Sequence, residues 1–356
     1  MITKWDDYFL HQTPRPLLET VVDTPDWIDR FYWNIQAPDG EVMFGAGLGQ
    51  YRTTSRMDSI VYLLHPGEQR ILRLGRQTTP EDFVDPVIGP LRFEIVEPMR
   101  RWRLRLDEDN PAGIGWDLTF TAPREPVDYR QFEFGNAEGK GSDYHHIVQH
   151  GVCEGRVALD GTSFSADRFL VSRDRSWGVR RAREGEALLL WLQHQFDDRD
   201  VCLIYVESRD GTPSYFDGAV TDADGRRPLL AVGHDLRLDP ATRDVLGGVV
   251  EVRDDRGHTY RMEYRDRLLR GYVGGIGYGG WQGRDRGSHF MEAHRIDMSR
   301  PTADILAEQP MHLFAHLMRT TLNGGGEHVA DLEGGITRSR RYTYRPRPLS
   351  AVDGNG

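Results

Sequence analysis

The sequence predicts an all-β fold, built either as two antiparallel β-barrels or as one large sandwich. Short runs of alternating apolar and polar residues recur along the chain. The cleanest is Arg101–Leu106, whose Trp and Leu side chains face one way and whose arginines face the other. Asp-Gly pairs separate many of these runs, which is typical of strands joined by tight turns. Such pairs occur at Asp39-Gly40, Asp160-Gly161, Asp210-Gly211 and Asp224-Gly225.

Composition indicates a globular protein without a nucleic-acid surface. The 356 residues are 38% hydrophobic and 28% charged, with a net charge of −10. A nucleic-acid-binding protein would need a basic face for phosphates. Cys153 and Cys202 form neither a disulfide framework nor a ligand cluster. Met1–Leu10 is polar and acidic, so we expect no signal peptide, and no run is long and apolar enough for a membrane span. We therefore expect a cytoplasmic bacterial protein.

The order of the runs predicts two domains and one long helix. We expect an N-terminal β-barrel-like domain over residues 1–150, a C-terminal one over residues 151–345, and a disordered tail over residues 346–356. The apolar residues of Thr302–Leu322 recur at helical spacing, so this segment predicts a helix. Pro310 should kink or divide that helix.

One motif near the middle of the chain contains the first candidate for a catalytic acid. An apolar run ends at Val171 and is followed by Ser172–Gly178, which contains turn-forming residues and a Trp. Asp174 lies three residues before Trp177, and a carboxylate beside an indole has the environment that raises a pKa and makes a proton donor. Alternatively, the Trp locks a turn, and Asp174 bonds backbone amides or Arg175. Both interpretations remain open at this point.

Glu154-Gly155-Arg156-Val157, followed by Asp174-Arg175-Ser176-Trp177-Gly178, resembles the Asp-x-x-Trp signature of a lipocalin-like family. This is the family of hydroxyneurosporene synthase, also called carotenoid hydratase, and tocopherol cyclases and some Diels-Alderases share its tandem fold. The resemblance implies two lipocalin-like (calycin-type) antiparallel β-barrels packed together around a hydrophobic pocket. It covers most of the chain, but a short helix expected within residues 1–28, the helix at 302–322 and the Arg- and Pro-rich tail at 337–356 have no counterpart in it.

The resemblance also implies a chemistry without a redox cofactor. An acid protonates an alkene, and water or an internal nucleophile captures the cation. Asp174 is then the acid candidate, and aromatic faces would stabilise the cation. Each aromatic candidate is equally explained by core packing. The candidates are Trp177, Trp191, Tyr205, Tyr278 and Trp281.

Several histidines and one glutamate are further candidates. His194 interrupts an apolar run, so it is either a satisfied core histidine or a residue of a ligand pocket. His289 and Glu292 follow a glycine-rich stretch, and Glu292 shares a strand face with His294. These two could relay protons, or Glu292 could simply pair with an arginine. We therefore include His194 and Glu292 with Asp174 as catalytic candidates, and His289 as a substrate-binding candidate.

The sequence predicts no metal and no cofactor. His145 and His146 would point to opposite faces of a strand, so at most one could join His150 in a site. Gly275–Gly280 only superficially resembles a dinucleotide fingerprint, because no βαβ pattern surrounds it. No nucleophile elbow or phosphate loop occurs.

Two functions remain open from the sequence. The first is a cofactor-independent lyase or isomerase, such as a hydratase, dehydratase or cyclase, that acts on a hydrophobic isoprenoid-like molecule. The second is a non-catalytic binding protein for such a molecule. An acid that faces a cavity beside a His or Tyr favours catalysis, whereas acids paired with buried arginines favour binding. The sequence does not predict the oligomeric state.

Overall fold

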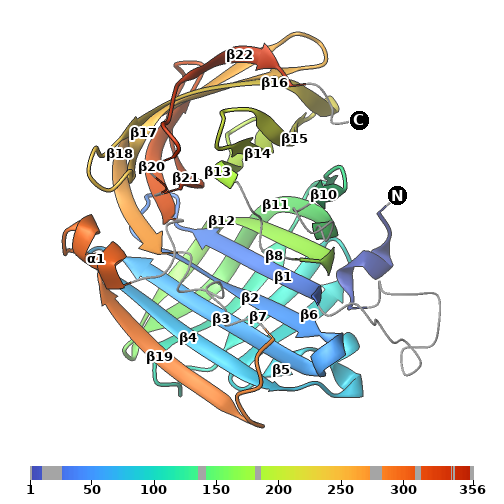
Figure 1. Cartoon of the computed structure of the whole chain (residues 1–356). Coiled ribbons are helices and arrows are strands. Elements are labelled where there is room, and N and C mark those ends of the chain that lie inside the picture. Colours follow the sequence, from blue (N-terminus) through green and yellow to red (C-terminus); the bar gives the residue numbers. More distant parts are fainter. Residues whose placement is uncertain are drawn as a thin grey trace.

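The computed structural model shows an almost entirely β protein (Figure 1). The strands form two antiparallel sheets that pack against each other. The structure describes residues 2–9, 26–134, 142–180, 186–272, 283–308, 314–337, 339 and 341–352.

The first sheet is large, curled and open (Figure 1). Its order is β19-β4-β3-β2-β1-β12-β11-β8-β7-β6-β5, and β9 and β10 pair with β11. Its strands are β1 (Trp27–Gln36), β2 (Met43–Tyr51), β3 (Arg56–His65), β4 (Glu68–Gln77), β5 (Val87–Ile88), β6 (Leu91–Glu97), β7 (Arg101–Leu106), β8 (Ile114–Thr121), β9 (Val127–Asp128), β10 (Phe132–Phe134), β11 (Ser142–Leu159), β12 (Thr162–Val179) and β19 (Phe290–Asp297). The short 3₁₀ helices are η1 (Lys4–Asp7), η3 (Arg52–Thr54) and η4 (Pro80–Phe83).

The inner face of this curled sheet holds a large aromatic and aliphatic core. The Trp33 ring lies 5.3 Å from that of Trp102 and 5.1 Å from that of Phe120. In β7 the Trp and Leu side chains are buried and the arginines are not, so the predicted alternation of this strand is confirmed. Each strand of this kind has one apolar face, and the sheet curls so that these apolar faces are buried against one another.

The second sheet closes into a barrel of eight strands. The order β15-β14-β13-β21-β20-β18-β17-β16 is closed by pairing of β15 with β16, and β22 adds to the outside of β16. Closure removes the exposed edges that an open sheet would leave. Its strands are β13 (Glu186–Gln195), β14 (Asp200–Ser208), β15 (Pro213–Asp222), β16 (Gly225–Leu238), β17 (Val245–Asp254), β18 (Thr259–Tyr272), β20 (Phe314–Leu322), β21 (Glu327–Ile336) and β22 (Arg347–Ala351).

The predicted fold class is confirmed. A lipocalin-like closed barrel packs on a second curled antiparallel sheet that forms a half-barrel, and a helix lies toward the C-terminus. The expected turns occur as well: Asp160 and Gly161, which join β11 to β12, have φ of +49° and +77°. Gly favours such left-handed conformations and Asp tolerates them, which is why this pair marks tight turns.

The long helix predicted at Thr302–Leu322 is wrong beyond its first two turns. Helix α1 spans only Thr302–Glu308, and the chain then forms β20 between β18 and β21. Both faces of β20 are covered: Leu317 packs toward the first sheet, and Met318 points into the barrel. A strand buried on both sides carries apolar residues at consecutive positions, so its pattern imitates a helical stripe.

The expected turn around Ser172–Gly178 is also wrong. The whole segment lies inside β12, which pairs with β1 on one side and β11 on the other. Because side chains alternate along a strand, Asp174 and Trp177 point to opposite faces of the sheet. The indole therefore does not flank the carboxylate as the motif suggested.

The two sheets divide the chain differently from the predicted domains. Strand β11 spans the predicted boundary at residue 150, and both β11 and β12 belong to the first sheet. Strand β19 lies within the predicted second domain, residues 151–345, but it pairs with β4 of the first sheet. The tail predicted over 346–356 is ordered in part, since Arg347–Ala351 form β22 against β16.

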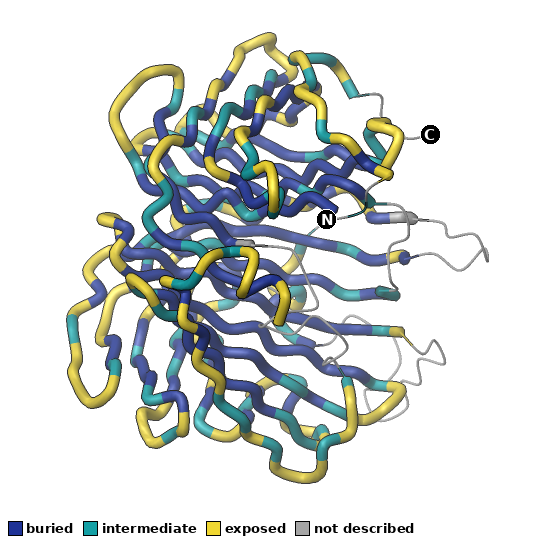
Figure 2. Tube along the Cα trace, turned by 60° about the vertical axis from the view of Figure 1, so that its left-hand side comes forward, coloured by how far each residue is buried: buried dark blue, intermediate teal, exposed yellow. Residues whose placement is uncertain are grey.

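The sheets meet along two apolar clusters, and buried residues fill the strands between them (Figure 2). One cluster joins β3 and β4 to β18, β20 and α1, and the other joins β9–β11 to β14 and β15. Trp191 of β13 packs against both clusters. Among the described residues, no helix is long and apolar enough to cross a membrane.

Candidate functional site

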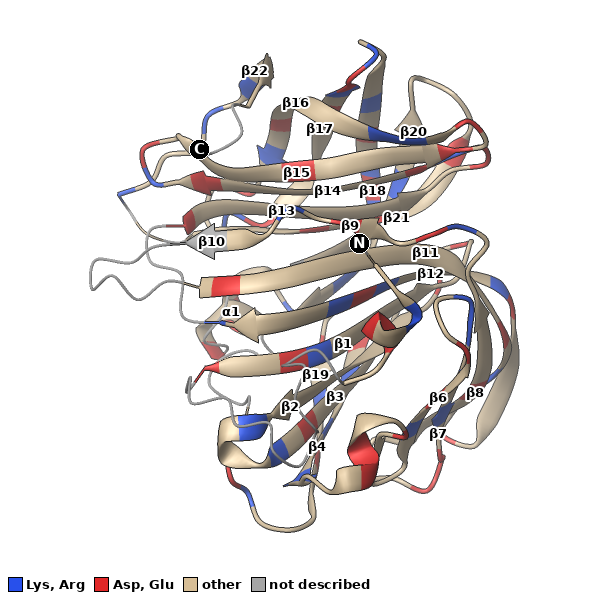
Figure 3. Ribbon diagram, turned by 90° about the vertical axis from the view of Figure 1, so that its right-hand side faces the viewer, with Lys and Arg blue, Asp and Glu red and all other residues tan. Residues whose placement is uncertain are grey.

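The face of the first sheet that meets the barrel is unusually polar. Tyr32 of β1 is the register partner of Asp174 in β12, and Asn34 is the partner of Ser172. Charged residues lie on strands inside the molecule as well as in its loops (Figure 3), and Arg30 of β1 is one of the buried ones. A row of polar groups in an interface needs partners or a function, because burying them without partners is costly.

Strand β2 supplies glycine opposite this polar row. Gly45 pairs with Asn34, and Gly47 pairs with Tyr32. A Cβ atom on Gly45 would lie 1.9 Å from the carbonyl oxygen of Trp33, so no larger residue fits there. The backbones of β1 and β2 therefore approach closely at this position, and the ladder between the two strands runs without a bulge.

The barrel presents two strands to this face. Trp191 of β13 is the register partner of Glu333 in β21, and Asp331 lies two residues before Glu333 on the same face. These side chains and the polar row enclose a small cavity of about 10 Å³, which we call the interface pocket. That volume suits about one water molecule. The residues that line it are Asn34, Gln36, Leu170, Ser172, Trp191, Gln193, Gln195, Asp331 and Glu333.

The two carboxylates of the pocket have different surroundings. Asp331 accepts hydrogen bonds from Asn34 Nδ2 at 3.0 Å and from the His316 backbone N–H at 2.8 Å. Burial raises the pKa of Asp331 to about 6, although the charge of His316 and these hydrogen bonds oppose the rise. Burial raises the pKa of Glu333 well above its usual value, and the negative charges of Asp331 and Asp174 raise it further. Glu333 is therefore the member of the pair with the stronger tendency to keep its proton.

Phenol and indole groups stand beside the carboxylates. The hydroxyls of Tyr32 and Tyr62 lie 3.1 Å apart, and the Tyr32 ring is 5.8 Å from that of Trp191. Burial raises the pKa of both tyrosines well above the usual value, so both are neutral hydrogen-bonding groups. Arg30 lies 5.8 Å above the Tyr32 ring. The pocket thus places an acid beside the Trp191 ring, and the Tyr32 ring lies next to that indole; aromatic faces of this kind can stabilise a cation.

Asp174 belongs to the same interface. Its Oδ2 lies 3.1 Å from His146 Nε2, and its side chain is buried. The His146 ring is 5.4 Å from that of Trp191. Within the described residues, Asp174 Oδ1 has no hydrogen-bond partner. Asp174 therefore faces a His and stands beside Tyr32 across the ladder, rather than pairing with Arg175 as the alternative supposed; Arg175 pairs with Asp29.

Three other predicted residues lie away from the interface pocket. Trp177 is on the opposite face of β12, where it stacks on His145 at 5.4 Å. His194 points into the barrel, where its Nε2 lies 2.7 Å from the Tyr264 hydroxyl and burial lowers its pKa to about 3. Tyr205 also lies inside the barrel, and its hydroxyl donates to Glu207 at 2.9 Å.

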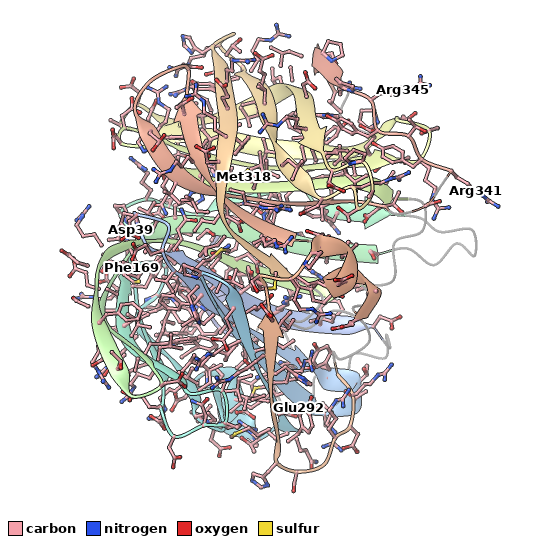
Figure 4. The ribbon with its side chains drawn as sticks, turned by 90° about the vertical axis from the view of Figure 1, so that its left-hand side faces the viewer. Asp39, Phe169, Glu292, Met318, Arg341 and Arg345 are labelled. Carbon is pink, nitrogen blue, oxygen red and sulfur yellow. The ribbon has the colours of Figure 1, made fainter. Side chains whose placement is uncertain are left out.

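The residues predicted around the glycine-rich stretch lie on the outer edge of the first sheet. Figure 4 places Glu292 on β19, and its carboxylate contacts Arg73 at 3.3 Å and His294 at 3.2 Å. The side chain of Glu292 is 36% exposed, and its pKa is lowered because these partners outweigh burial. His289 is exposed beside Ser288. The remaining candidates, Tyr278 and Trp281, lie outside the described residues.

Sequence reasoning missed Asp331 and Glu333. They stand at alternate positions in an apolar, glycine-containing strand, and that spacing places both carboxylates on one face. The sequence contained this spacing. It did not show that this face of β21 packs against the first sheet. Within the described residues, no group of three or more His, Cys, Asp or Glu side chains is arranged to hold a metal ion.

Comparisons with known proteins agree with this architecture. Residues 2–312 match the model of a family of unknown function, DUF8625. No curated protein sequence matches the chain. A crystal structure of a candidate AttH protein from Nitrosomonas europaea has a TM-score of 0.56 at 13% identity, over 91% of this chain and 98% of that one. The structure of CghA has a TM-score of 0.50 at 12% identity, over 94% and 98% of the two chains.

Kievitone hydratase from Nectria haematococca has a TM-score of 0.45 at 12% identity, over 91% of this chain and 93% of its own. At such identities, the likeness to the candidate AttH protein and to CghA shows a shared fold.

Proposed function

The chain belongs to DUF8625, a family of unknown function, and we propose that it is a cofactor-independent lyase or isomerase that acts on a hydrophobic small molecule by acid catalysis. The observation that carries this proposal is the carboxylate pair of the interface pocket. Glu333 and Asp331 differ in environment, and such a difference assigns one group as acid and the other as base. The resemblance of the Asp174–Gly178 motif to the carotenoid hydratase signature supports the same class of chemistry.

In the proposed reaction, Glu333 gives its proton to one carbon of an alkene, and a carbocation forms at the neighbouring carbon. The Trp191 face and the neutral Tyr32 ring stabilise this positive charge. A water molecule then adds to the cation and loses a proton to ionised Asp331. Transfer of that proton back to Glu333 restores the starting state, so atoms and charge balance over the cycle. Run in reverse, the same steps dehydrate an alcohol.

The lining of the pocket favours a substrate that carries oxygen. Gln193 and Gln195 stand beside Trp191 on β13, and their amides are suited to hydroxyl or carbonyl groups. The flanking apolar clusters would take the hydrocarbon part. An isoprenoid-like alcohol or ketone has this combination.

The alternative is a binding protein without catalysis. It is favoured by the cross-sheet hydrogen bonds of the pocket residues, since Asn34 bonds Asp331 and Gln36 Nε2 donates to the Val329 carbonyl at 2.8 Å. Such bonds could serve only to join the two sheets. This alternative and the catalytic proposal differ in whether the bound molecule exchanges atoms with water.

Isotope incorporation tests the proposal. Molecules that copurify with the protein, identified by mass spectrometry, and a panel of unsaturated isoprenoid alcohols are incubated with the protein in D₂O and in ¹⁸O-water. We expect deuterium at carbon, and ¹⁸O in the product if water captures the cation. Glu333→Gln should slow deuterium entry by roughly 10²–10⁴-fold, the usual contribution of a general acid.

Glu327→Gln is the matched control, because Glu327 lies on the same strand but is exposed and paired with Arg319. It should keep the wild-type rate. A wild-type protein that binds a panel molecule and incorporates neither isotope would show that the binding alternative is right.

A further inference from the structure

His316 on β20 is buried between two hydrogen-bond acceptors. Its side chain is 1% exposed, its Nδ1 lies 3.1 Å from the Leu332 carbonyl oxygen, and its Nε2 lies 3.0 Å from Asp244 Oδ1. A carbonyl oxygen can only accept a hydrogen bond, so Nδ1 must carry a proton. The state of Nε2 then depends on whether Asp244 is ionised.

Asp244 is surrounded by donors and positive charge. Arg267 Nη1 donates to its Oδ2 at 2.6 Å, Arg270 Nη1 lies 3.6 Å away, and the Thr302 hydroxyl donates at 3.2 Å. Burial alone would raise the pKa of Asp244, but His316 and Arg267 hold that pKa well below its usual value. Asp244 is therefore a carboxylate that only accepts, and both ring nitrogens of His316 must donate.

We infer that His316 is a buried imidazolium, held by Asp244, that keeps Asp331 ionised and so leaves the proton of the interface pocket on Glu333. His316 acts through Asp331 and does not line the pocket, which makes it a positioning residue. The charge of His316 follows from the two acceptors that its ring nitrogens face and from the donors around Asp244. Its consequence for Glu333 rests on the proposed function.

The charges alternate in a row across the barrel wall. Arg267 contacts Asp244, Asp244 contacts the His316 ring, and the His316 backbone N–H donates to Asp331. Each member is stabilised by the neighbour of opposite sign, because a buried charge needs a partner.

Other charged groups also face the carboxylate pair. Arg30 of β1 lowers the pKa of Glu333, and Asp174 of β12 raises it. Asn34 of β1 donates a neutral hydrogen bond to Asp331. Among the described groups, His316 is the cation whose charge lowers the pKa of Asp331. Removing the charge of His316 should therefore shift the titration of Asp331 upward.

Nitrogen NMR tests the charge state directly. Protein labelled with ¹⁵N-histidine is measured between pH 6 and pH 8, with the ring signals assigned through the backbone of His316. We expect both ring nitrogens of His316 to carry protons throughout this range. A ring nitrogen without a proton at pH 7 would overturn the inference. This measurement needs no substrate, so a positive result stands even if no isotope enters any panel molecule.

His316→Gln tests the consequence, because Gln keeps a donor but removes the charge. The side-chain carboxyl of Asp331, followed by ¹³C NMR, should titrate at a pH higher by about one unit or more. His328→Gln is the matched control, since His328 contacts Phe196 near the start of β21. The Asp331 titration should stay unchanged in that control. An unchanged titration in His316→Gln would also overturn the inference, and if that variant does not fold, the nitrogen spectrum of the wild type decides.

Discussion

Replacing Glu333 with Gln should stabilise the protein, and by an amount that grows with pH. Burial and the nearby carboxylates raise the pKa of Glu333 well above its usual value in the folded state. In the unfolded chain a glutamate titrates near pH ~4.3. Between these two values, folding requires Glu333 to take up a proton that the unfolded chain has released. The stability of the wild type therefore falls as pH rises through this window, and Gln, which does not titrate, removes that loss.

The size of the effect follows from linkage. One proton bound only by the folded state changes the free energy of unfolding by about 1.4 kcal/mol for each pH unit. For as long as the folded protein keeps the Glu333 proton, the advantage of Glu333→Gln over the wild type should therefore grow by about this amount with each pH unit above the unfolded-state pKa. Asp331 titrates in both proteins, and because its charge raises the pKa of Glu333, the titrations of the two carboxyls are coupled in the wild type.

Urea unfolding at a series of pH values and constant ionic strength measures this difference. Glu327→Gln is the control, since Glu327 lies on the same strand but is exposed and paired with Arg319. A gap between wild type and Glu333→Gln that does not change with pH would refute the assignment of a proton to Glu333.

Two further variants compare a residue of the interface, Asp174, with a residue at the edge of the first sheet, Glu292. Asp174→Asn replaces a buried carboxylate that lies 3.1 Å from His146 Nε2, so we expect a loss of about 1–3 kcal/mol in urea unfolding. It also removes a negative charge near Glu333, so the Glu333 carboxyl should titrate at lower pH by NMR; unchanged stability and titration together would contradict this role. Glu292→Gln alters a partly exposed edge pair, so its free energy of unfolding should change by less than about 1 kcal/mol. Its rate of deuterium incorporation should equal that of the wild type, and a large loss of that rate would restore Glu292 as a catalytic candidate.

The fold class was accessible from the sequence because its signals are local. Alternation in β7 and the turn at Asp160-Gly161 each depend on a few neighbouring residues. The failure at β20 has a physical cause as well. A strand covered on both faces, with Leu317 toward one cluster and Met318 toward another, loses its alternation and imitates a helix.

The site was harder to predict because it is made by contact between sheets. Trp191 and Asp174 were both identified from the sequence, and both lie in the interface. His194 was identified from the same strand as Trp191, but it is an odd number of residues away and so points into the barrel. Glu333 becomes distinctive only when Asp331 and Asp174, from different parts of the chain, are brought near it.

The central claim is that the interface pocket holds one proton and that Glu333 carries it. The most direct measurement is the infrared difference spectrum of the wild type minus Glu333→Gln at pH 7. We predict a band of a protonated carboxylic acid in the wild type that is absent from the variant. A difference spectrum with only carboxylate bands would contradict the claim, because Glu333 would then be ionised and unable to donate a proton.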